Sequence, residues 1–134
     1  MAIRIRFVDG QLTEDGSAIG EIRLNDFTER FEAPLGFWNV KDYERQWALG
    51  LRLVSEGSSK SCLITAMYDP AVANFIVWWP IYRERDHVVV QNQVLFMKRL
   101  KAKFDAEDPY RSIDDRVSVT EDGEPVSEWI VDAD

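Results

Sequence analysis

Residues 39–57 read NVKDYERQWALGLRLVSEG, and their pattern is that of one amphipathic helix. Apolar side chains recur every three or four residues and so share one helix face; they are Val40, Tyr43, Trp47, Leu51 and Val54. Asn39 is a preferred N-cap residue, Asp42 suits the positive end of the helix dipole, and Gly57 suits the left-handed position after the last turn. These signals predict a helix over about residues 40–56.

On both sides of this helix, apolar residues alternate with polar ones or form short β-branched and aromatic runs, as in β-strands. Turn residues separate these runs, which predict strands at 2–8, 19–24, 27–33, 61–67, 74–82, 87–96 and 126–131. The three runs after the helix have short connections and should form an antiparallel meander. The chain is therefore predicted to be a single α+β domain over residues 1–134. We expect a mostly antiparallel central sheet of about five to seven strands, with the helix packed on one face.

Three residues of the predicted strand 74–82 have positional consequences. Pro80 has no N–H for a β ladder, so it should lie at a bulge or at a sheet edge. Trp78 and Trp79 are adjacent and should point to opposite faces of the sheet, with at least one of them in the core.

Residues 97–116 show no regular pattern, and we expect them to be mostly irregular.

The composition fits one folded domain in a reducing compartment. The 134 residues are 46% hydrophobic and 12% aromatic, which is enough for one core. No apolar run approaches the roughly 18–20 residues of a membrane-spanning helix, and residues 1–6 alternate charged with apolar side chains instead of forming a signal peptide. Cys62 is the single cysteine. We therefore expect a cytoplasmic protein.

The negative charge is concentrated near the C-terminal end. The formal net charge is −8, and residues 105–134 contain eleven acidic residues against Arg111 and Arg116, a local net charge of −9. Residues 1–104 have a net charge of +1. An acidic surface repels nucleic-acid phosphates and anionic lipids and attracts basic partners. We expect neither direct nucleic-acid binding nor membrane binding; the alternative role of such a segment is solubility alone.

No combination of residues predicts catalysis. His87, the one histidine, follows Asp86, but no nucleophile motif such as G-x-S-x-G accompanies it. One histidine and one cysteine are too few for a typical zinc site, and the glycine-rich phosphate-binding motifs are absent. The acidic pairs within residues 105–115 could hold Mg²⁺ or act as general acid and base, but they lie in a polar segment. We expect no enzyme, no metal and no cofactor; the alternatives are a small carboxylate-dependent enzyme and a non-enzymatic adaptor domain.

A set of short segments gives a more specific indication. They are Phe37-Trp38, Asp42-Tyr43, Gln46-Trp47, Leu63-Ile64-Thr65, Met67-Tyr68-Asp69-Pro70, Asn74-Phe75, Trp78-Trp79, Tyr82-Arg83, Gln91-Asn92, Asp108-Pro109-Tyr110, Glu121-Asp122-Gly123 and Ser127-Glu128-Trp129. They extend over roughly residues 25–130 and include no catalytic signature. In these segments the chain resembles the immunity proteins of bacterial contact-dependent growth inhibition systems.

The resemblance implies a small cytoplasmic protein that binds and neutralises the C-terminal toxin domain of a cell-surface effector, protecting the producing cell and its siblings. Toxins of such systems are frequently nucleases, including enzymes that cleave transfer RNA. A nuclease needs a basic cleft for its substrate, and an acidic inhibitor can dock there instead of the nucleic acid. The candidate toxin-binding residues are therefore Asp105, Glu107, Asp108, Asp114, Asp115, Glu121, Asp122 and Glu124.

Overall fold

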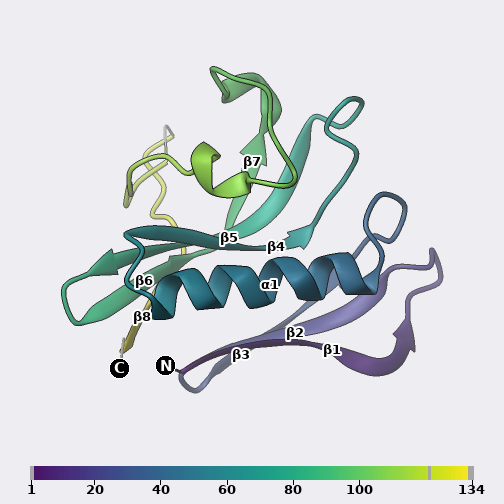
Figure 1. The fold of residues 1–134 in the computed structure, drawn as a ribbon, viewed down its shortest axis with the longest axis horizontal. Helices are drawn as coiled ribbons and strands as arrows, with labels where there is room; N and C mark the ends of the chain where they lie inside the picture. The colour runs from purple at the N-terminus through teal and green to yellow at the C-terminus, as the bar shows by residue number, and fades with distance from the viewer. Residues whose placement is uncertain (1, 121, 133–134) are drawn as a thin grey trace.

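The computed structural model describes residues 2–120 and 122–132. In this part of the chain, one α-helix is combined with eight strands in two antiparallel sheets (Figure 1). The elements are β1 (Ile3–Leu12), β2 (Ala18–Leu24), β3 (Phe27–Ala33), α1 (Val40–Ser55), β4 (Lys60–Ala66), β5 (Phe75–Glu84), β6 (His87–Gln91), β7 (Gln93–Phe96), the 3₁₀ turns η1 (Met97–Arg99) and η2 (Pro109–Ser112), and β8 (Glu128–Asp132). The predicted α+β class and the predicted helix are confirmed. None of the described residues forms a helix long and apolar enough to cross a membrane.

The larger sheet has five strands in the order β4-β5-β6-β8, with β7 also paired to β5. The predicted meander is confirmed, but the predicted strand 87–96 is divided into β6 and β7. Both pair with β5 in one continuous register, in which Glu84 faces His87 and Phe75 faces Phe96. Between the two strands the rows of Trp79 and Pro80 are not paired, and Pro80 has no N–H to donate to the ladder. Pro80 thus lies at an irregularity of the ladder, in a central strand and not at a sheet edge.

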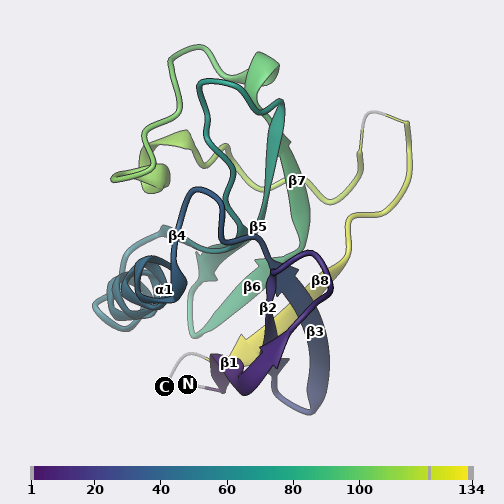
Figure 2. The same cartoon turned by 90° about the vertical axis from the view of Figure 1, so that its right-hand side faces the viewer.

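The three N-terminal strands form a sheet of their own, in the order β1-β2-β3, instead of joining the central sheet. Its inner face contains Ile22, which is fully buried, and packs against α1 and the larger sheet. Phe7 contacts Trp47 at a ring distance of 4.7 Å, and Phe27 stacks on Trp129. Figure 2 shows this purple sheet beside β6 and β8. Alternation predicts strands but not which strands share a sheet, and this explains the difference.

Both faces of the larger sheet are covered. Trp78 and Trp79 point to opposite faces, as predicted, and both are buried. Trp79 packs toward Trp129 on the face that the N-terminal sheet covers, whereas Trp78 packs against Phe104 on the other face. Phe104 belongs to residues 97–116, whose regular structure is limited to η1 and η2, so the prediction of an irregular segment is confirmed. This irregular segment is the cover of the second face.

Both ends of α1 have the predicted capping residues. The Asn39 side chain accepts a hydrogen bond from the Asp42 N–H at 2.9 Å, and the Asp42 side chain accepts one from the Asn39 N–H at 3.0 Å. This reciprocal pair is a capping box. After the last turn Gly57 has a φ of 94°, and the Ser58 N–H donates to the Leu53 carbonyl oxygen. Local hydrogen bonds therefore set both limits of the helix.

Helix α1 lies along the edge of β4 that faces away from β5, and its side chains take the place of a neighbouring strand. Gln46 uses both ends of its amide: Nε2 donates to the Cys62 carbonyl oxygen and Oε1 accepts from the Ile64 N–H, each at 2.8 Å. Trp47 Nε1 donates to the Ile64 carbonyl oxygen at 2.7 Å. An unpaired strand edge invites association with other strands, so these bonds protect β4 and also fix the helix.

Gly50→Ala is expected to destabilise the domain. A Cβ at position 50 would lie 2.4 Å from the Cys62 carbonyl oxygen, so helix and strand would have to move apart. We expect the free energy of unfolding to fall by about 1–3 kcal/mol, as is typical of overpacking, even though alanine favours a helix by about 1 kcal/mol. Urea denaturation followed by circular dichroism measures this change. Gly36→Ala is the control, because an added Cβ there meets nothing within 4 Å; equal stability of the two variants would contradict the close contact.

Gln46→Ala is expected to lower the free energy of unfolding by more than the lost side-chain volume alone would. It leaves the buried Cys62 carbonyl and Ile64 N–H without the partners that Gln46 provides. Each buried group without a partner costs about 1–3 kcal/mol, so we expect a loss of about 2–4 kcal/mol. Thermal and urea unfolding measure it, with Glu44→Ala on the exposed side of the same helix as the matched control. If the two variants unfold alike, the edge bonds contribute little.

Candidate binding surface

The acidic residues predicted to bind a partner lie on the cover of the larger sheet and on the hairpin that follows it. Residues 104–113, which we call the strap, are held on the domain by Phe104, Pro109 and Ile113, all of which are buried. Glu107 and Asp108 lie between these anchors and are exposed. The strap therefore has an irregular backbone in a fixed position, with its charged side chains in solvent.

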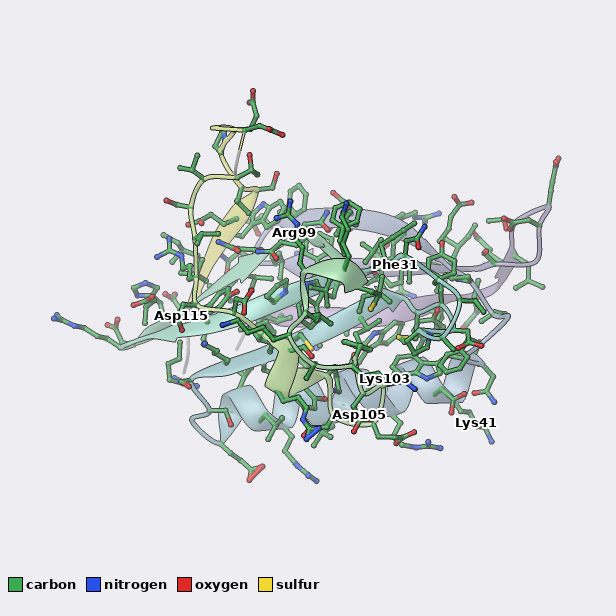
Figure 3. All side chains as sticks on the ribbon, turned by 90° about the horizontal axis from the view of Figure 1, so that it is seen from above. Phe31, Lys41, Arg99, Lys103, Asp105 and Asp115 are labelled. Carbon is green, nitrogen blue, oxygen red and sulfur yellow. The ribbon has the colours of Figure 1, made fainter. Side chains whose placement is uncertain are left out.

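The first group of acids lies where the strap passes α1. Asp105 Oδ1 accepts a hydrogen bond from the Glu107 N–H at 2.9 Å, and the Asp105 carbonyl oxygen accepts one from the Asp108 N–H at 3.1 Å. Asp108 forms an ion pair with Arg111 at 3.7 Å. Figure 3 shows Asp105 beside Lys103, over α1. The structure thus brings three of the predicted acids together, and one of the three is paired with a cation.

A small cavity of about 70 Å³ separates this part of the strap from α1. Its lining consists of Trp38, Asp42, Arg45, Gln46, Leu49, Ala106, Glu107, Pro109 and Tyr110. Gln46 Nε2 donates to the Tyr110 hydroxyl oxygen at 3.2 Å, and burial raises the pKa of Tyr110 to about 12, so this hydroxyl is neutral at physiological pH. Typical small-molecule sites measure roughly 300–1,000 Å³. The cavity is of a size for one partner side chain, not for a substrate.

The second group of acids consists of Asp114 and Asp115, directly after the strap. Lys60 Nζ donates to Asp115 Oδ1 at 2.7 Å and to the Ile113 carbonyl oxygen at 3.3 Å. The hydrogen bond and the charge of Lys60 lower the pKa of the Asp115 carboxyl. In Figure 3, Asp115 lies toward the β5–β6 hairpin, away from Asp105. The first two groups are therefore separate, and Asp115, like Asp108, is already paired.

The third group lies on a hairpin of residues 118–126. Its two sides are joined by hydrogen bonds from Thr120 N–H to the Glu124 carbonyl oxygen and from Val126 N–H to the Ser118 carbonyl oxygen. Asp122 and Glu124 are exposed near its tip, whereas Glu121 lies outside the described residues. Figure 2 shows the hairpin standing apart from the strap. The seven predicted acids that the structure describes therefore occupy three places on the surface and do not form one patch.

The base of this hairpin is fixed to the larger sheet. Arg116 forms ion pairs with Glu128 at 2.5 Å and with Glu84 at 3.8 Å. Gln91 Nε2, buried in β6, donates to the Val117 carbonyl oxygen at 2.9 Å. Arg116 is thus paired with two carboxylates of the larger sheet. The base of the hairpin is fixed in this way, and the acidic residues near its tip are exposed.

The residues weighed as catalytic do not converge. His87 follows the turn between β5 and β6, where its Nδ1 is 3.4 Å from the exposed Asp86 carboxylate. Cys62 is fully buried, and burial raises the pKa of its thiol, which keeps the thiol protonated. In residues 2–120 and 122–132, no group of three or more His, Cys, Asp or Glu is placed to hold a metal ion.

Sequence reasoning missed an exposed aromatic cluster. Tyr68, Phe75 and Phe96 contact each other in series, with ring distances of 5.4 Å and 6.4 Å, and each is more than one third exposed. The available signal was strand length: β5 is longer than β4, whose last residue, Ala66, pairs with Val77 and leaves Phe75 beyond the end of its neighbour.

Comparison with known proteins gives three concordant results. The model of the family described as the CdiI N-terminal domain matches residues 33–134. The chain is 33% identical over 125 residues to the immunity protein CdiI of Enterobacter cloacae subsp. cloacae, covering 93% of this chain and 83% of that protein. It is also similar to a chain of the CdiA-CT/CdiI toxin and immunity complex from Enterobacter cloacae, with a TM-score of 0.84, 30% identity, and coverage of 98% of this chain and 90% of that chain. The chain therefore belongs to the CdiI family, and the resemblance to immunity proteins of contact-dependent growth inhibition systems is confirmed.

Proposed function

We propose that this chain is an immunity protein that binds and neutralises the C-terminal toxin domain of its cognate contact-dependent growth inhibition effector. The observation that carries this proposal is the similarity over nearly the whole chain to a protein named as an immunity protein and to a chain of a toxin and immunity complex. The chain acts in the cytoplasm, protects the producing cell and its siblings, and does so by binding and not by catalysis. The absence of a convergent catalytic site among the described residues supports an inhibitor over a carboxylate-dependent enzyme.

In this proposal the toxin is a basic nuclease. An enzyme that cleaves transfer RNA is one example of this class. The local net charge of −9 in residues 105–134 supports this choice, because a nuclease concentrates positive charge where its substrate binds. The same charge disfavours direct binding of the immunity protein to nucleic acid or to a membrane. The eight acidic residues predicted from the sequence remain the proposed electrostatic contacts.

The positions of these acids indicate how they act. Asp108 and Asp115 are paired with Arg111 and Lys60, so their fields are partly neutralised, while the hairpin presents Asp122 and Glu124 at its exposed end. Because these acidic residues are spread over three places, they create a broad negative electrostatic field and do not form one buried contact. Such a field accelerates association with a basic partner and orients it. We therefore assign these residues mainly to steering.

The first test is direct binding to the C-terminal toxin domain of the cognate effector, measured by calorimetry with a parallel assay of toxin activity. We expect one-to-one binding that abolishes toxin activity and weakens at least about tenfold between low and high ionic strength, because salt screens the steering charges. The toxin domain of an unrelated system is the control and should not bind. A chain that fails to bind or to protect is not the cognate immunity protein.

The second test removes four acids at once. Replacing Asp105, Asp108, Asp114 and Asp115 with Asn should slow association with the toxin domain about tenfold at low salt and flatten its salt dependence. The fold should be retained, because the affected ion pairs are exposed and contribute little to stability. Stopped-flow association kinetics provide the measurement.

The matched control neutralises four exposed acids elsewhere: Asp9, Glu14, Asp26 and Glu44. It removes the same total charge from the chain, so any difference between the two variants comes from where the charges lie. Equal slowing in both would assign the effect to net charge, and unchanged kinetics in the first variant would remove residues 105–115 from the interface.

A further inference from the structure

The cavity between α1 and the strap extends from the interior of the domain to its surface. Trp38 and Gln46 line it and are buried, with exposed fractions of 9% and 7%. Arg45 and Glu107 also line it, and both are exposed. On the strap side the lining is fixed by Pro109, which is buried. A partner side chain can therefore enter this cavity from solvent without opening the domain.

Three charged residues line the cavity, and one of them has no charged partner. Arg45 forms an ion pair with Asp42 at 3.6 Å. Glu107 donates its N–H to Asp105 Oδ1, but none of the described residues forms a hydrogen bond or ion pair with the Glu107 carboxylate. Lys103 is exposed and lies beside Asp105 in Figure 3, outside the lining. The lining therefore has two acids and one base, and its net charge of −1 is the charge of Glu107.

The Tyr110 hydroxyl adds a second polar group to the lining. Its oxygen accepts a hydrogen bond from Gln46 Nε2 at 3.2 Å. A hydroxyl has two acceptor lone pairs and one proton, so this bond leaves Tyr110 able to hydrogen-bond an occupant of the cavity. An occupant with N–H groups could therefore bond to this hydroxyl and to the Glu107 carboxylate.

The remaining lining and the volume of the cavity limit the size and shape of the occupant. Leu49, Ala106 and Pro109 contribute apolar surface, and Trp38 contributes an indole ring. One water needs roughly 10–15 Å³, so a cavity of about 70 Å³ has room for several waters or for the end of one side chain. Lys and Arg combine an apolar stem with a cationic end, and cations also bind favourably to indole rings. The cavity therefore matches the end of a Lys or Arg side chain.

We propose that this cavity receives one Lys or Arg side chain of the toxin domain, an inference that rests on the proposed immunity function. The cationic end binds the Glu107 carboxylate and the Tyr110 hydroxyl, and the stem contacts the apolar part of the lining. A basic toxin domain supplies such side chains on its surface. In a recess that excludes water, an ion pair prolongs the lifetime of a complex, whereas exposed charges mainly raise the rate of encounter. Glu107 thus differs from the acidic residues assigned to steering.

Glu107→Gln tests the charge without changing the size of the side chain. We expect dissociation of the full chain from the toxin domain of the cognate effector to accelerate about tenfold, with association changed less than about twofold. Stopped-flow kinetics measure both rates. Glu44→Gln is the matched control, because Glu44 is an exposed acid of α1 outside the lining, and it should dissociate as the wild type does. Slower association with an unchanged dissociation rate would make Glu107 a steering charge and overturn the inference.

Ala106→Leu tests the cavity by filling it from the strap. It should also accelerate dissociation about tenfold, whereas Ala102→Leu, at an exposed position outside the lining, should not. Adding Glu107→Gln to Ala106→Leu should have little further effect, because both changes remove the same contact. Additive effects in folded variants, verified by circular dichroism, would contradict a shared occupant. Glu107→Gln replaces an exposed side chain, so it tests the inference even if Ala106→Leu disturbs the strap.

Alanine replacement of each Lys and Arg of the toxin domain identifies the occupant. One replacement should accelerate dissociation as Glu107→Gln does, and combining the two should add little. A toxin domain in which no single replacement behaves in this way would overturn the inference, as would folded Glu107→Gln and Ala106→Leu variants with wild-type dissociation rates. Both outcomes leave the immunity function standing. A wild-type chain that does not bind the toxin domain would reject the proposed function and this inference together.

Discussion

One side-chain amide joins the main layers of this protein. Gln46 projects from α1, donates to Cys62 and accepts from Ile64 on β4, and also donates to the Tyr110 hydroxyl on the strap. The amide reproduces the donor and acceptor pattern of a neighbouring strand at an edge that would otherwise be open. The amide of Gln46 therefore helps to fix the relative positions of the helix, the sheet and the strap. Its removal would break the hydrogen bonds that join all three.

The aromatic residues of α1 extend the same arrangement to the N-terminal sheet. Trp47 bonds to Ile64 through its indole N–H and packs against Phe7 through its ring, so one side chain contacts both sheets. The Tyr43 hydroxyl donates to the Pro34 carbonyl oxygen at 2.7 Å and accepts from the Met67 N–H at 3.0 Å. The polar ends of these side chains bond to backbone groups of the loops and of β4, while their rings fill the core between the two sheets.

Local features of this fold were predictable, and non-local ones were not. The helix followed from its apolar spacing and from Asn39 and Gly57, because caps depend on nearby residues only. The separate N-terminal sheet did not follow, since alternation at Ile22 is the same whichever sheet the strand joins. For the candidate site, the sequence located the acidic residues, but their division among strap, Lys60 and hairpin depends on tertiary contacts. Several residues behind the family resemblance, Gln46 and Trp47 among them, prove to be the scaffold that holds α1 on β4.

The hairpin of residues 118–126 makes its own cross-strand hydrogen bonds and is tied to the sheet through Arg116, while none of its described residues belongs to the core. Its tip can therefore change sequence at little cost in folding free energy. Under the proposed function, toxin and inhibitor can diverge in step at such a place, because a new pairing requires only a few exchanges on an unchanged scaffold and a former partner is rejected by misplaced charge. The charges proposed to meet the toxin at this tip are thus encoded apart from the residues that form the core.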